Sequence, residues 1–124
     1  MSPHRIAVVE DNPDNRLLLQ ALLADTYLID EYEDGATALA GIVTSRPALV
    51  LLDISLPGMD GPEVLKRLRA APTFAGIPVI ALTAHAMSGD REKYLALGFD
   101  GYVTKPILDE EILFAAIRAL LPKS

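Results

Sequence analysis

Hydrophobic and polar positions alternate along the chain in a pattern that predicts five strand and helix pairs. Short apolar runs predict strands, and apolar residues at spacings of three and four between them indicate amphipathic helices. The predicted strands are residues 6–9, 27–32, 49–52, 79–82 and 101–104. Either Asp11 or Asn12 can cap the first helix, and Pro13 suits its first turn, where a missing N–H costs nothing.

Four of the predicted helices present a recognisable apolar face. From the first to the last, these faces consist of Leu18, Ala21 and Leu22; Ala36, Leu39, Ala40 and Val43; Val64, Leu65 and Leu68; and Ile112, Ala115, Ala116, Ala119 and Leu120. Another helix is expected over residues 87–97, ended by Gly98, with Tyr94 and Leu95 in the core. Its residues 88–93 carry almost no apolar side chain, so we expect this region to rearrange locally.

The order and character of these elements predict an α/β fold. Residues 49–52 are apolar at every position, which indicates a strand buried on both faces, as in a parallel sheet covered by helices. Five alternating pairs therefore predict a doubly wound five-stranded parallel sheet with right-handed crossovers. In such folds functional groups gather at the carboxyl ends of the strands.

Polar residues follow four of the predicted strands. Glu10 and Asp11 come after the first strand, Asp53 after the third, Thr83 after the fourth, and Lys105 after the fifth. Taken singly, each could be a helix cap, a turn residue or a surface lysine. Their joint placement favours a site in which three carboxylates, a hydroxyl and an ammonium meet at one edge of the sheet.

This set of side chains suits phosphoryl transfer with a divalent cation. Crowded carboxylates repel one another unless a cation joins them, and Mg²⁺ is the usual choice where phosphate completes its shell. Asp11 and Asp53 are expected as direct ligands, with Glu10 acting through water. Asp53 is also the best candidate for the nucleophile, because it ends the buried central strand. Lys105 and Thr83 would stabilise the phosphoryl oxygens.

Composition narrows the possible classes of protein. The 124 residues suit one domain, and the formal charge of −6 argues against a general nucleic-acid surface, which requires a basic face. Without cysteine there is no disulfide framework and no thiolate metal site. No apolar run approaches the length that crosses a bilayer, and the first residues do not read as a secretory signal. We therefore expect a cytoplasmic protein that binds neither membrane nor nucleic acid.

Four segments together resemble the receiver domains of response regulators. These are the acidic pair at residues 10–11, the segment LLDISLPGMDG at 51–61, LTA at 82–84 and GYVTKP at 101–106. The resemblance runs from Arg5 to Leu121. Residues 83–102 are most similar to single-domain regulators of the DivK type and to receivers attached to hybrid sensor kinases.

The resemblance implies a flavodoxin-like (βα)5 receiver fold with strand order 2-1-3-4-5. It also implies that a histidine kinase or a histidine phosphotransfer protein phosphorylates Asp53. The backbone carbonyl of Ser55 would complete the Mg²⁺ site. On phosphorylation Thr83 would move toward the phosphoryl group and Tyr102 would turn inward, and the peptide bond before Pro106 would be cis.

We therefore expect residues 1–124 to form a single receiver domain without an output domain. It would be a switch rather than a turnover enzyme, and would control a downstream protein effector through the surface of its fourth helix, fifth strand and fifth helix. One alternative is a receiver fragment of a hybrid sensor kinase. Another is an aspartyl-phosphate phosphatase, which usually carries a second aspartate where Ser55 stands. A flavin carrier would require a phosphate-cradling loop where Glu10 and Asp11 stand.

Overall fold

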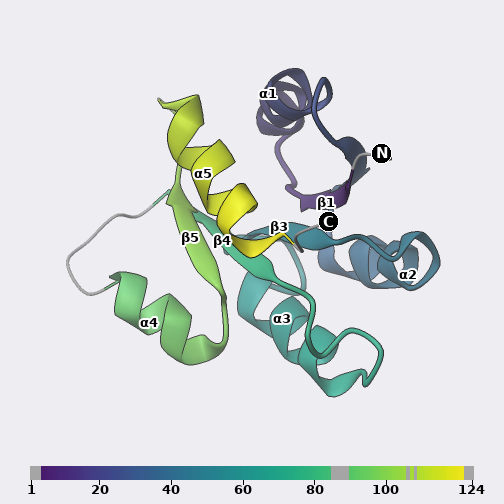
Figure 1. Ribbon diagram of the computed structural model, residues 1–124. Coiled ribbons are helices and arrows are strands. Elements are labelled where there is room, and N and C mark those ends of the chain that lie inside the picture. Colours follow the sequence, from purple (N-terminus) through teal and green to yellow (C-terminus); the bar gives the residue numbers. More distant parts are fainter. Residues whose placement is uncertain (1–3, 85–89, 106, 108, 122–124) are drawn as a thin grey trace.

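A computed structural model describes residues 4–84, 90–105, 107 and 109–121 of the chain. Strands and helices alternate strictly along it (Figure 1). The strands are β1 (Arg5–Val9), β2 (Leu28–Tyr32), β3 (Leu49–Asp53), β4 (Val79–Thr83) and β5 (Gly101–Thr104). The helices are α1 (Pro13–Leu23), α2 (Gly35–Ser45), α3 (Gly61–Ala70), α4 (Asp90–Leu97) and α5 (Glu110–Leu120).

The five strands form one parallel sheet in the order β2-β1-β3-β4-β5. This confirms the predicted topology. β1 and β3 pair directly, so the chain changes direction across the sheet between them. Such a switch point opens a crevice beyond the carboxyl ends of the two strands. The residues that follow β1 and β3 are therefore placed where ligands bind in this class of fold.

Helices cover both faces of the sheet. On one face α1 and α5 pack on a cluster that includes Leu51 of β3, and on the other α2, α3 and α4 pack on a cluster that includes Leu52 (Figure 1). All five residues of β3 are buried. The predicted burial of this strand on both faces is confirmed, and it fixes the position of Asp53 at its end.

The predicted faces of three helices are offset by one residue from the fully buried rows, although Leu22, Leu39, Ala116 and Leu120 still pack partly buried against the core. The buried residues are Leu19 and Leu23 in α1; Gly35, Ala38 and Ile42 in α2; and Leu113 and Ile117 in α5. Residues expected in the core, such as Val43 and Ile112, are 58% and 59% exposed. These helices carry apolar residues on two adjacent rows, and the docking of each helix on the sheet decides which row is buried. The face predicted for α3 is confirmed, because Val64, Leu65 and Leu68 are buried.

Asx residues begin several of the helices. The side chain of Asn12 accepts hydrogen bonds from the N–H groups of Asp14 and Asn15 at 2.8 and 3.2 Å, and Pro13 is the first residue of α1. Asn12 is thus the cap, rather than Asp11. Asp60 caps α3 in the same way. Because Asn12 caps α1, the carboxylate of Asp11 does not have to do so and can contribute to the group of acids at the edge of the sheet.

Few side chains of α4 that the structure describes are buried against the sheet. Tyr94 is 5% exposed, as predicted, whereas Leu95 is 39% exposed and the prediction that it lies in the core was wrong. With eight residues, α4 has room for few contacts with the sheet, and Tyr94 makes the deepest of those that the structure describes.

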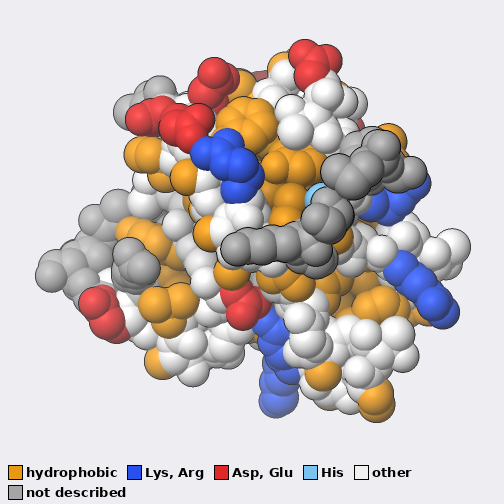
Figure 2. Space-filling view, viewed as in Figure 1, with side chains coloured by type: hydrophobic (Ala, Val, Ile, Leu, Met, Phe, Trp, Pro, Cys, Tyr) orange, Lys and Arg blue, Asp and Glu red, His pale blue; other side chains and the backbone are white. Residues whose placement is uncertain are grey.

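Charge is mixed on the face of the molecule seen in Figure 2. Acidic and basic side chains are interspersed there, with hydrophobic atoms between them. Among the residues that the structure describes, no helix has both the length and the apolar character needed to cross a membrane.

Candidate functional site

The predicted site residues stand at the carboxyl edge of the sheet. Glu10 follows β1 directly, Asp53 and Thr83 are the last residues of β3 and β4, and Lys105 follows β5. Backbone hydrogen bonds continue the sheet just past its strands, since the Lys105 N–H donates to the Thr83 carbonyl at 2.7 Å. The edge is therefore a rigid frame for these side chains.

The ammonium of Lys105 joins two of the buried acids. Its Nζ lies 2.9 Å from Oδ2 of Asp53 and 3.0 Å from Oε2 of Glu10. Asp53 and Glu10 are 2% and 0% exposed, and the Lys105 side chain is 16% exposed. The sequence predicted Lys105 as a partner of phosphoryl oxygens, and in this structure its ammonium pairs with both Asp53 and Glu10. Contacts this short in a water-poor setting are strong charge-assisted hydrogen bonds.

The pKa values of both Glu10 and Lys105 are raised in this setting. Burial raises the pKa of Glu10, and the neighbouring charge of Asp53 raises it further, while the contact with Lys105 offsets only part of this rise. Burial alone would lower the pKa of Lys105, but its hydrogen bonds with Asp53 and Glu10 and their charges outweigh burial and raise it. The site thus holds a charged lysine together with three carboxyl groups.

Three carboxylates are close enough to share one cation. Glu10, Asp11 and Asp53 each offer an oxygen, and these atoms all lie within 4.8 Å of one another. Asp11 is exposed, whereas the other two are buried, so the group opens to solvent on the side of Asp11. An all-oxygen set with an open side fits Mg²⁺, which keeps several of its waters.

Residues at the start of α1 hold Glu10 in place. Its Oε1 accepts hydrogen bonds from the Asn12 N–H at 3.2 Å and from the Asn15 side chain at 3.4 Å. The guanidinium of Arg16 donates to the carbonyl oxygens of Glu10 and Asp11 at 2.8 and 3.1 Å. We did not predict Asn15 and Arg16. Glu10 and Asp11 precede α1, so no helical spacing along the sequence indicates these contacts.

Backbone groups of the loop after β3 hold Asp53. The Ser55 N–H donates to Oδ1 of Asp53 at 3.0 Å, which leaves Oδ2 for Lys105. The loop then folds back, and the Gly61 N–H donates to the Ile54 carbonyl at 3.0 Å. A Cβ atom at Gly61 would lie 2.5 Å from the carbonyl oxygen of Asp53, so only glycine permits this approach.

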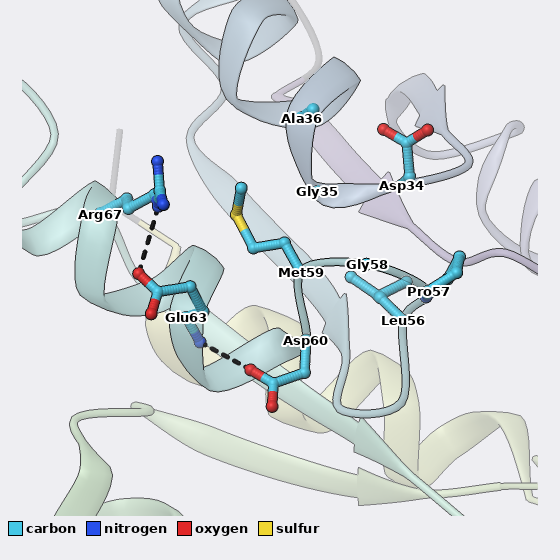
Figure 3. A pocket seen from close by; sticks show the side chains of 10 residues that line it. All are labelled: Asp34, Gly35, Ala36, Leu56, Pro57, Gly58, Met59, Asp60, Glu63 and Arg67. Carbon is cyan, nitrogen blue, oxygen red and sulfur yellow. Dashed lines mark hydrogen bonds and ion pairs between the residues drawn. The ribbon is translucent and has the colours of Figure 1, made fainter.

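An open groove of about 970 Å³ runs beside the same loop (Figure 3). It lies between the start of α2 at Asp34, the loop at Met59 and the exposed side of α3. Arg67 donates to Glu63 across one turn of α3 at 3.1 Å. The groove is separate from the acidic edge, because none of the residues that line it belongs to the group around Asp53.

Tyr94 contacts both Thr83 and Tyr102. The hydroxyl oxygens of Thr83 and Tyr94 are 3.3 Å apart and form a buried hydrogen bond. The rings of Tyr94 and Tyr102 have centroids 5.9 Å apart. We expected Tyr94 in the core but did not predict its contact with Thr83. Pro106, the predicted cis proline, lies outside the described residues.

The fold and this edge together define a phosphoacceptor signalling domain of the α/β class. A family model for the response regulator receiver domain matches residues 6–118, and the chain belongs to this family. Members of the family are phosphoaccepting switches of two-component systems, found in response regulators and in hybrid histidine kinases.

Curated relatives and solved structures agree with this membership. Response regulator PleD of Caulobacter vibrioides is 44% identical over 117 residues, and Sensor protein GacS of Pseudomonas syringae pv. syringae is 38% identical over 118 residues. These matches cover 94% and 92% of this chain but only 26% and 13% of the relatives, so the chain spans a minor part of each.

A solved structure of the receiver domain of sensor histidine kinase PA1611 from Pseudomonas aeruginosa PAO1 has a TM-score of 0.86 and 32% identity. The match covers 96% of this chain and 98% of that domain. That structure has a magnesium ion coordinated in its active site cleft.

Proposed function

We propose that the protein is a switch in which Asp53 accepts a phosphoryl group from a phosphohistidine donor. The observation that carries this proposal is the ammonium of Lys105, which contacts both Asp53 and Glu10 beside the open carboxylate of Asp11. One edge of the sheet thus supplies a nucleophile, acids for a cation and a fixed positive charge. These are the parts that phosphoryl transfer requires.

Each side chain has a distinct role in the transfer. A carboxylate oxygen of Asp53 forms a bond to phosphorus while the bond between phosphorus and the donor nitrogen breaks. The Ser55 N–H and the Lys105 ammonium orient the carboxylate beforehand by holding one oxygen each. Lys105 then pairs with a phosphoryl oxygen, and the hydroxyl of Thr83 donates a hydrogen bond to another.

Mg²⁺ is the cofactor that suits this set of oxygen ligands. Asp11 and Asp53 would hold it directly, Glu10 through water, and the backbone carbonyl of Ser55 would complete the protein ligands. When bound, it neutralises charge on the phosphoryl oxygens. The carboxylate oxygens of Glu10, Asp11 and Asp53, which all lie within 4.8 Å of one another, support this assignment.

Phosphorylation would change the surface formed by α4, β5 and α5. Thr83 moves toward the phosphoryl group, Tyr102 turns inward, and a downstream protein effector recognises the altered surface. The donor is a histidine kinase or a histidine phosphotransfer protein, and the setting is cytoplasmic. The similarity to both PleD and GacS supports a role either in a response regulator or within a hybrid sensor kinase.

Phosphorylation by a small donor tests the proposal. The protein is incubated with acetyl phosphate and Mg²⁺, and its intact mass is measured. We expect the wild type to gain one phosphoryl group and Asp53→Asn to gain none. The exposed Asp25 gives a matched control, and Asp25→Asn should be labelled like the wild type. Equal labelling of Asp53→Asn would refute the assignment of the acceptor.

The same variants separate a switch from a phosphatase. A serine, Ser55, stands where such enzymes usually place a second acid, so we propose that the protein does not sustain turnover. Nitrophenyl phosphate is then hydrolysed no faster by the wild type than by Asp53→Asn. Steady hydrolysis that depends on Asp53 would instead favour the enzyme.

A further inference from the structure

Tyr94 is the main anchor of α4. Of the α4 side chains that the structure describes, it is the one that is buried, at 5% exposure, whereas Leu95 and Leu97 are 39% and 50% exposed. Its ring packs edge-on against Phe99 at a centroid distance of 6.2 Å and lies 5.9 Å from the ring of Tyr102. The position of α4 on the sheet therefore depends heavily on this side chain.

The hydroxyl of Tyr94 reaches the edge of the sheet that carries the site. It forms a hydrogen bond of 3.3 Å with Oγ1 of Thr83, and Thr83 is 1% exposed. Thr83 ends β4 directly beside β3, where Leu82 pairs with Asp53. A buried hydrogen bond thus connects the anchor of α4 to a residue at the acidic edge.

We propose that Tyr94 is a positioning residue that holds Thr83 in the resting conformation and passes the movement of Thr83 on to α4. This rests on the proposed function, in which the hydroxyl of Thr83 turns to a phosphoryl oxygen on Asp53. Thr83 then releases the Tyr94 hydroxyl. A buried hydroxyl that loses its partner is costly, so Tyr94 moves toward water and α4 moves with it.

The hydrogen bond stabilises the resting state relative to the phosphorylated one. A protein hydrogen bond contributes modestly in net terms, and its loss would shift the equilibrium between two states by about five-fold. Because the apparent affinity for a phosphoryl mimic depends on the population of the competent state, removing the hydroxyl alone should tighten binding by that factor.

Beryllofluoride, a phosphoryl mimic, gives the test on the whole chain. Its half-saturating concentration is measured at saturating Mg²⁺ from amide NMR signals of the wild type and of Tyr94→Phe, which keeps the ring. We expect Tyr94→Phe to need about five-fold less beryllofluoride, and its α4 signals without the mimic to shift toward their bound positions. Tyr27→Phe is the matched control. Tyr27 lies before β2 on the other face of the sheet, and its loss of a hydroxyl should change neither readout.

A double-mutant cycle separates this role from a merely structural one. In Thr83→Ala the hydroxyl of Tyr94 no longer has Thr83 as its partner, so adding Tyr94→Phe should leave the half-saturating concentration unchanged. An equal effect of Tyr94→Phe in both backgrounds, or none in either, would overturn the proposal. If beryllofluoride does not bind even the wild type, the proposed function itself fails, and this inference fails with it.

Discussion

At the carboxyl edge of the sheet, β3 and α4 are held in opposite ways. Every residue of β3 is buried, and two helical layers cover the strand. In α4 the described side chains include one that is buried, Tyr94. One small domain can thus combine a firmly held strand with a loosely held helix. In the proposed function, Asp53 stays in place to accept the phosphoryl group, and α4 moves to change the surface that a partner recognises.

Amide hydrogen exchange tests this comparison most broadly. The amides of β3 should exchange only through global unfolding, which costs roughly 5–15 kcal/mol in domains of this kind. Those of α4 should exchange through local opening at a lower free energy, and their protection should change when beryllofluoride and Mg²⁺ are added. Uniform protection of both elements, unchanged by the mimic, would show that α4 is held as firmly as β3.

Leucine truncations test the same difference in stability. Leu52 is fully buried in β3, so Leu52→Ala should lower the free energy of unfolding by about 2–5 kcal/mol. Leu95→Ala, the matched change on α4, should cost less than about 0.5 kcal/mol because Leu95 is 39% exposed. Urea denaturation measures both. Equal losses would mean that α4 is anchored as firmly as the central strand.

The stability gained from Mg²⁺ tests whether the cation binds at the acidic edge next to β3. A cation that binds only the folded state at 100 times its dissociation constant stabilises the fold by about 2.7 kcal/mol. We expect the wild type to gain this stability over the EDTA-treated protein and Asp11→Asn to lose most of the gain. Asp25→Asn, remote from the acidic edge, should keep it. Retention of the full gain in Asp11→Asn would place the cation elsewhere.

Much of the fold could be predicted from sequence because the strands are unambiguous. Residues 49–52 are apolar throughout, and the polar residues that follow four of the strands indicate one edge of the sheet. The faces of α1, α2 and α5 could not be predicted as well. Leu18 and Leu19 lie on adjacent rows of α1, and only the docking of the helix decides that Leu19 is buried.

The site, like the fold, has features that the sequence predicts and others that only tertiary packing decides. Asp53, Glu10, Asp11, Thr83 and Lys105 follow from their positions after the strands. The contacts of Asn15 with Glu10 and of Tyr94 with Thr83 depend on where α1 and α4 pack, which spacing along the chain does not specify. Local pattern thus predicts which groups reach the edge, and tertiary packing decides which of them touch.

A structure of crystals grown with Mg²⁺ and beryllofluoride tests directly whether Asp53 accepts a phosphoryl group. We predict beryllofluoride on a carboxylate oxygen of Asp53, with Lys105 on one fluorine and the hydroxyl of Thr83 on another. The metal should lie among Asp11, Asp53 and the carbonyl of Ser55. If neither ion is bound at this edge and Lys105 keeps its contacts with Asp53 and Glu10, Asp53 is not the phosphoryl acceptor.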